Sequence, residues 1–238
     1  MVAAVRSSGS ARGRRGPGET PQTLARAFYA RPTLTVARDL IGKVLVHRSP
    51  AGVTSGRIVE VEAYIGEDDP ACHAAPGPTR RNEPLYGEPG HVYVYFNYGM
   101  HEMFNVVTER RGKPAAILVR ALEPLDGLEV MEQRRLAAGG RQPAAPRRAI
   151  PPGHLCRGPG NLARAMGITL ADNRLDLCGP ELFIEDRGLD VGQVAWSPRI
   201  GIRVGADRPW RCYVVGSRAV SGPTASPASV RSSSAALP

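Results

Sequence analysis

Two glutamates and a tyrosine occupy alternate positions in the segment IVEVEAYIG, residues 58–66. In a β-strand this spacing places Glu60, Glu62 and Tyr64 on one face, while the small apolar residues between them face the core. A lone glutamate on such a face most often points into solvent. Here the loop that follows adds two aspartates and His73. Carboxylates, a histidine and aromatic rings that converge on one sheet surface predict a pocket with groups able to move protons.

A second unusual stretch is GHVYVYFNYGMH, which holds three of the seven tyrosines of the chain. If this stretch is a strand, alternation places Tyr93 and Tyr95 on one face. We interpret Tyr93 as a packing residue. Tyr98 lies in an Asn-Tyr-Gly sequence that is typical of a turn. A large aromatic side chain at the tip of a turn either packs locally or contacts a partner.

The composition favours a soluble intracellular protein. The 238 residues are enough to bury the core of one domain. Four cysteines occur without a CxxC pair, which argues against a disulfide framework and a cysteine zinc site and fits a reducing cytoplasm. No apolar run approaches the length of a membrane-spanning helix, and the N-terminus lacks the apolar core of a secretory signal.

More than half of the net charge of +9 comes from the two ends of the chain. Residues 1–18 carry four arginines and residues 221–238 carry one, with no acid in either, so residues 19–220 hold 26 basic and 22 acidic side chains. Between residues 133 and 171, seven arginines occur without an acid, which suits a phosphate backbone. The Ala/Gly/Pro-rich part of this stretch, 137–153, also fits a solvated, partly disordered loop.

Hydrophobic periodicity predicts a single α+β domain over residues 20–220, between a disordered basic tail at 1–19 and a second tail at 221–238. We expect a mainly antiparallel, curved sheet with flanking helices and a protruding β-hairpin. The predicted helices span 20–30, 32–42, 124–137 and 158–168. The predicted strands span 43–49, 56–66, 91–96, 103–109, 115–122, 181–187, 199–205 and 210–216.

Several separated blocks together resemble one known family. EVEAYIGEDDPACHA, GHVYVYFNYGMHEMFNVV, ILVRALEPLDG, LCRGPGNLARAMGI and PRIGI occur in the order found in the alkyladenine (3-methyladenine) DNA glycosylases, and the resemblance runs from about Thr23 to Gly216. It implies a monofunctional enzyme that flips an alkylated or deaminated purine out of double-stranded DNA and hydrolyses its N-glycosidic bond. The implied substrates are 3-methyladenine, 7-methylguanine, hypoxanthine and ethenoadenine. The implied setting is a monomer without cofactor, metal or membrane contact, in a bacterial cytoplasm beside the nucleoid.

The resemblance also implies roles for residues around the pocket. Glu62 corresponds to the general base that deprotonates the attacking water. Tyr64, His73 and Tyr95 correspond to the aromatic walls around the flipped base. Electron-rich rings suit cationic lesions, because a cation over a ring face is attracted by about 1–2 kcal/mol when desolvated.

Three further roles follow from the same resemblance. Tyr98, at the hairpin tip, corresponds to a wedge that inserts into the DNA and fills the space left by the flipped base. Asn105 corresponds to the pocket floor, where the family excludes the amino group of guanine. Arg120 corresponds to a residue that helps to hold the water and the target phosphate.

Other interpretations remain open at this stage. A damage-binding protein without hydrolysis is one alternative, although it does not require the carboxylate of Glu62. A metal-dependent hydrolase built on Asp68, Asp69 and His73 is another, but no HxxxH or CxxC spacing supports it. The GPGNLARAM segment, which includes Asn161, predicts either a phosphate cradle at a helix N-terminus or ordinary helix capping.

Lysine is nearly absent, which bears on the type of reaction. A lyase-coupled glycosylase needs an amine that forms a Schiff base. Lys43 and Lys113 are the two lysines of the chain, and neither falls in the blocks assigned to the pocket. We therefore expect simple hydrolysis that leaves an intact abasic site.

Overall fold

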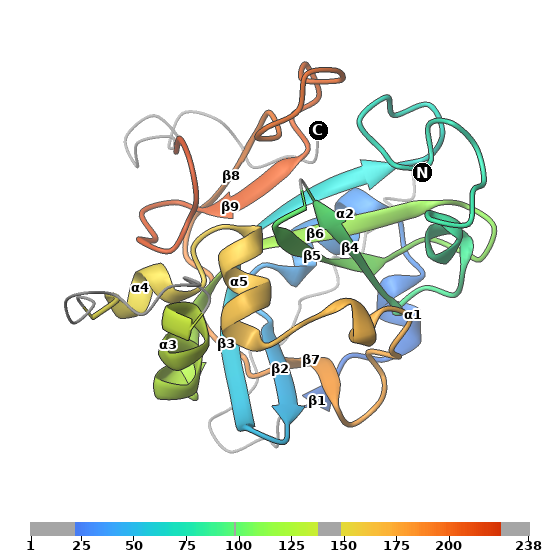
Figure 1. The fold of residues 1–238 in the computed structure, drawn as a ribbon. Coiled ribbons are helices and arrows are strands. Elements are labelled where there is room, and N and C mark those ends of the chain that lie inside the picture. Colours follow the sequence, from blue (N-terminus) through green and yellow to red (C-terminus); the bar gives the residue numbers. More distant parts are fainter. Residues whose placement is uncertain (1–21, 98, 138–148, 225–238) are drawn as a thin grey trace, which may run out of the picture.

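The computed structural model describes residues 22–97, 99–137 and 149–224, and these form an α+β fold around one antiparallel sheet (Figure 1). The main path of the sheet runs β1-β7-β2-β3-β6-β5-β4, and β9 pairs with both β3 and β8. The predicted fold class is therefore confirmed. The strands are β1 (Gln22–Thr23), β2 (Val44–Ser49), β3 (Gly52–Ile65), β4 (Val92–Asn97), β5 (His101–Val107), β6 (Ala115–Asp126), β7 (Leu182–Asp186), β8 (Val194–Ser197) and β9 (Arg211–Val214).

Short helices pack around this sheet. The α5 helix contacts β5, β6 and α3, while α2 packs on β3 and β6. These contacts bury the apolar side chains that set the helical periodicity, including Val36 of α2 and Leu162 of α5. The helices are α1 (Arg26–Tyr29), α2 (Thr33–Leu40), α3 (Leu128–Ala137), α4 (Pro152–Leu155) and α5 (Pro159–Met166), with 3-10 turns at Glu83–Tyr86 and Leu170–Asp172.

Strand β3 is the central element, because it pairs with β2, β6 and β9. Val59 and Val61 belong to the main core, as the alternation predicts. The register with β6 shifts on both sides of Glu60, which marks a β-bulge. Glu60 and Glu62 are both fully buried, so neither points into solvent as a lone glutamate on such a face most often does.

Two predicted elements differ from the structure. Residues 199–205, predicted as a strand, form a loop in which Gly201 (φ +77°) and Gly205 (φ +61°) take left-handed conformations. The backbone N–H of Ile200 donates to a glutamate side chain rather than to a neighbouring strand. The first predicted helix, 20–30, shrinks to the four residues of α1, because residues 22–23 pair with β7 as β1.

The boundaries of the domain stay a prediction. The whole of the expected N-terminal tail, the segment 138–148 and residues 225–238 lie outside the described residues. Ser221, the first residue of the expected C-terminal tail, donates two hydrogen bonds to Glu60 in the interior. Among the described residues, no helix is long and apolar enough to cross a membrane.

Candidate functional site

Two adjoining cavities open where β3, β4 and the loop after β3 meet. Both are lined by Tyr64, Ala71, His73 and Tyr95. The outer cavity measures about 230 Å³. It is completed by Asn97, Met103, Leu118, Arg120, Pro159, Ile200, Gly201 and Ile202. The inner cavity is completed by Cys72, Leu85, Tyr93, Asn105 and Ala116.

Glu62 lies directly behind the wall of the outer cavity. Its Oε1 accepts a hydrogen bond from the Ile200 backbone N–H at 2.7 Å. Its Oε2 accepts from the Tyr64 hydroxyl at 2.9 Å and from Arg120 Nη1 at 3.2 Å. All three donors line the outer cavity. Since the glutamate is fully buried, its carboxylate is held in one orientation by three separate segments of the chain.

Arg120 joins Glu62 to a second buried carboxylate. Its Nε donates to Glu60 at 2.9 Å, and its Nη2 donates to the Ser221 hydroxyl at 3.2 Å. Glu60 also accepts from Arg211 Nε at 2.7 Å. Burial acts to lower the pKa of Arg120, but the charges of Glu62 and Glu60 outweigh it and raise that pKa overall. The result is a buried cluster of two carboxylates and two guanidinium groups.

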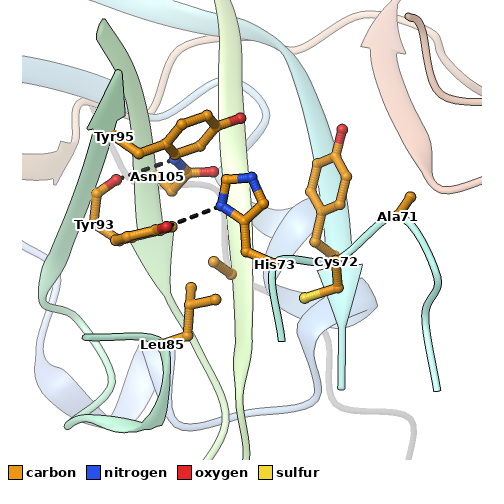
Figure 2. Close-up of a pocket in the computed structure, with 9 residues that line it drawn as sticks. Ala71, Cys72, His73, Leu85, Tyr93, Tyr95 and Asn105 are labelled. Carbon is orange, nitrogen blue, oxygen red and sulfur yellow. Dashed lines mark hydrogen bonds between the residues drawn. The ribbon is translucent and has the colours of Figure 1, made fainter. Parts of the chain in front are cut away.

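His73 forms the centre of an aromatic wall, which Figure 2 shows. Its Nδ1 lies 2.9 Å from the Tyr93 hydroxyl, and its ring meets that of Tyr95 edge to face with centroids 4.4 Å apart. Burial, with a smaller contribution from the positive charge of Arg81, lowers the pKa of His73 below its ordinary value. This shift favours the uncharged form of the His73 ring.

The side chain of Asn105 has its orientation fixed by two backbone carbonyls. Its Nδ2 donates to Tyr93 O at 3.0 Å and to Met103 O at 3.1 Å. Because carbonyl oxygens only accept, the NH₂ group must face them and Oδ1 must lie on the other side. Asn105 lines the inner cavity and is buried, and its place at the floor of a base-binding pocket stays a prediction.

Arg199 is a buried residue that the sequence did not single out. Its guanidinium forms two bonds with the carboxylate of Asp69, at 2.5 and 2.8 Å, and stands over the ring of Tyr64 with its centre 4.7 Å from the centroid. Nothing local in the sequence signals this contact, because Asp69 lies 130 residues away. Arg199 directly precedes Ile200, whose N–H holds Glu62.

The structure brings together six of the seven predicted site residues: Glu62, Tyr64, His73, Tyr95, Asn105 and Arg120. Tyr98 lies outside the described residues, while Phe96 and Met100 beside it are exposed. Tyr93, interpreted from the sequence as a packing residue, is buried and also lines the inner cavity, where it holds His73. The sharing of a strand face by Tyr93 and Tyr95 was a signal for this role.

The sequence also suggested a metal site that includes Asp69 and a phosphate cradle at the start of α5. The structure shows what the residues of each contact. Asp69 is engaged by Arg199, and the described residues include no group of three metal-binding side chains. At the start of α5, Gly158 takes a φ of +91° and the Asn161 side chain donates to Arg157 O at 2.8 Å. Asn161 therefore bonds to the preceding turn, no side-chain hydrogen bond from a described residue caps the start of α5, and phosphate contact at this turn stays a prediction.

Comparisons with known proteins agree on one family. A family model described as Methylpurine-DNA glycosylase matches residues 27–218. The chain belongs to the methylpurine-DNA glycosylase family. Relatives provisionally named 3-methyladenine DNA glycosylase include one from Methanocella arvoryzae, 48% identical over 83% of this chain and 95% of its own length. Similar proteins from Burkholderia lata and Myxococcus xanthus are 45% and 46% identical over 89% and 83% of this chain, and over 97% and 93% of their own lengths.

Membership of this family confirms the predicted resemblance and the enzyme class. The chain is a monofunctional DNA glycosylase, a hydrolase of DNA repair that acts on damaged DNA. This excludes the alternative of a damage-binding protein without catalysis.

Proposed function

We propose that this glycosylase flips an alkylated or deaminated purine into the cavity beside β3 and hydrolyses its N-glycosidic bond with a water activated by Glu62. The observation that supports this most is the hydrogen bonding of the Glu62 carboxylate. Oε1 accepts one bond within the described part of the chain, whereas Oε2 accepts two. A carboxylate oxygen has room for about two donors. Oε1 can therefore accept a proton from a water molecule.

The reaction needs few groups. Water loses a proton to Glu62 and adds to the anomeric carbon of the sugar as the bond to the base breaks. Arg120 has one N–H on each terminal nitrogen with no partner among the described residues, and these can orient the water or a DNA phosphate. General base catalysis of this kind contributes about 10²- to 10⁴-fold to a rate. The absence of lysine from the cavity lining is consistent with hydrolysis rather than lyase chemistry.

The cavity lining suits a flat purine. Tyr64, His73 and Tyr95 offer ring faces and edges, and a neutral His73 does not repel a cationic lesion such as 3-methyladenine or 7-methylguanine. Hypoxanthine and ethenoadenine are neutral, so the rings attract them less, and their excision depends more on how closely the pocket positions them. Asn105 is fixed at the inner end by two backbone carbonyls, so it disfavours the 2-amino group of guanine. 7-Methylguanine carries the same group, and its positive charge must offset that penalty.

Extrusion of the base costs a few kcal/mol, which a wedge in the vacated space offsets. We propose that Tyr98 supplies this wedge, at the tip of the β4–β5 hairpin. Phe96 and Met100, two residues before and after Tyr98 in the sequence, both have exposed side chains. We further propose that the enzyme acts as a monomer.

A duplex with one hypoxanthine or ethenoadenine tests the proposed reaction. The wild-type enzyme should release the base and give strand breaks after alkali, with no covalent complex after borohydride. Glu62→Gln should bind the same duplex without releasing the base. Strand cleavage without alkali would contradict simple hydrolysis, and full activity in Glu62→Gln would contradict the role of Glu62.

A further inference from the structure

Arg199 stands behind the pocket wall rather than in the pocket. It lines neither cavity, whereas Tyr64 lines both. The Arg199 guanidinium stacks on one face of the Tyr64 ring, 4.7 Å from its centroid, and approaches the ring of Trp210 at 5.1 Å. The tyrosine ring therefore lies between a buried cation and the space proposed for the flipped base.

This cation is paired almost completely with one carboxylate. Arg199 and Asp69 have fully buried side chains, and their two bonds measure 2.5 and 2.8 Å. Two backbone carbonyls, of Ala63 and Gly205, accept the remaining bonds of the terminal nitrogens. A second cation, Arg208, approaches Asp69 at 3.8 Å and is partly exposed. The charges directly behind Tyr64 thus depend on a single ion pair.

The charge on one face of an aromatic ring affects what binds to the other face. A cation is attracted by the electron-rich face of a tyrosine, whereas a second cation on the opposite face opposes it. The interaction is strong only where water is excluded, as it is around Arg199. A neutral purine that stacks on the same ring is affected much less.

We propose that the Arg199–Asp69 pair is a specificity device, which sets how strongly the pocket prefers cationic over neutral lesions through the ring of Tyr64. This inference rests on the proposed function, because it takes Tyr64 to be a wall of the base-binding pocket. Arg199 does not touch the reacting atoms. It acts through Tyr64, and also through the adjacent Ile200, whose N–H orients Glu62.

The test is an internal competition between a duplex with 7-methylguanine, which is cationic, and one with hypoxanthine, which is neutral. Both duplexes are present in one reaction, so the ratio of their excision rates does not depend on how much of a variant is folded. Arg199→Met removes the cation and leaves Asp69. We expect the ratio of 7-methylguanine to hypoxanthine excision to rise by about 3- to 10-fold.

Asp69→Asn should shift the same ratio in the opposite direction, because it leaves the cation unbalanced. The double variant Arg199→Met with Asp69→Asn should return the ratio to within about twofold of wild type. Arg208→Met is the comparison variant. Arg208 stacks on Trp210 at 4.7 Å and approaches Asp69 at 3.8 Å, but it is partly exposed and does not stand over the ring of Tyr64. The excision ratio of this variant should therefore change by less than about twofold.

Each outcome separates this inference from the proposed function. If Arg199→Met and Asp69→Asn slow both substrates by the same factor, the pair only positions the pocket and the specificity role is wrong. If the two ratios move in the same direction, the electrostatic explanation is also wrong. A wild-type enzyme that excises neither base would contradict the proposed function itself, before any variant is compared.

Discussion

Glu60 and Glu62 are two residues apart on β3, and both are fully buried, yet their surroundings differ. Glu60 accepts four hydrogen bonds, two on each oxygen, from Arg120, Arg211 and the N–H and hydroxyl of Ser221. Glu62 accepts three, with one on Oε1. The two carboxylates are also linked, because each receives a bond from Arg120.

Under the proposed mechanism, this difference lets one strand carry one carboxylate that stabilises the structure and one that takes part in the reaction. A carboxylate whose oxygens are both saturated has no position left for a water molecule. Glu60 therefore holds Arg120 in place, while Glu62 keeps one acceptor position beside the cavity. The spacing of two residues places both side chains on the same side of β3, where Arg120 donates a hydrogen bond to each.

The largest effect should follow from removal of the shared partner. Arg120→Gln leaves Glu60 with fewer partners and Glu62 without its cation, and a broken buried pair costs about 3–5 kcal/mol. We expect a marked fall in the free energy of unfolding together with loss of base excision. Chemical denaturation and excision assays on the same preparation measure both. Normal stability would show that the cluster is not held by Arg120.

Glu60→Gln should reduce the free energy of unfolding more than Glu62→Gln does. It weakens bonds to two buried arginines, so we expect a loss of about 3 kcal/mol in the free energy of unfolding. Glu62→Gln removes the charge facing one arginine at 3.2 Å and should cost about 1 kcal/mol. Urea denaturation of both variants provides the measurement. Equal losses would remove the distinction between a structural and a chemical carboxylate.

Tyr64→Phe sharpens the comparison, because it changes the surroundings of Glu62 and leaves Glu60 intact. Burial, followed by the charge of Glu62, raises the pKa of Tyr64, so its hydroxyl keeps its proton and donates. A bond to a charged group contributes about 1.5–3 kcal/mol. We expect single-turnover excision of hypoxanthine to slow by roughly tenfold, while Tyr86→Phe, a half-buried control whose hydroxyl donates to Glu67, should leave it unchanged.

The smallest expected effect is on the pH dependence of stability, and it tests the surroundings of His73 rather than those of the two carboxylates. The pKa of His73 is lower in the folded chain than in the unfolded chain, where it is about 6.5. Below that pH the unfolded chain takes up the proton first, so stability falls as the pH drops through this window. We expect the melting temperature to change less between pH 7 and about pH 5.5 in His73→Asn than in the wild-type protein. An identical dependence of the melting temperature on pH in the wild type and in His73→Asn would contradict a lowered pKa of His73.

Local alternation was enough to predict most of the sheet. Strands β3 and β4 follow the apolar and polar alternation of their sequences, because one face of each contacts the core. The same rule failed at residues 199–205, where Ile200, Ile202 and Val204 also alternate. There the left-handed glycines break the extended backbone, and the side chain of Arg199 finds a partner in Asp69. Alternation carries no information about such distant contacts.

The sequence was enough to predict the residues of the candidate site, but not the hydrogen bonds and ion pairs that connect them. The spacing of Glu62, Tyr64 and the tyrosines of β4 placed them on converging faces. What the sequence could not give was the burial of Glu60 or the role of Arg199, since both depend on partners 60 or more residues away. The preorganisation of a carboxylate by three donors from separate segments is a property of the folded chain alone.

The most direct test compares single-turnover excision of hypoxanthine by Glu62→Gln and Glu60→Gln, each at a temperature where it is fully folded. The account predicts that Glu62→Gln binds the lesion but is slowed by about 10²- to 10⁴-fold, while Glu60→Gln stays within about tenfold of wild type. A Glu60→Gln variant as slow as Glu62→Gln, or an active Glu62→Gln variant, would contradict the assignment of Glu62 as the base.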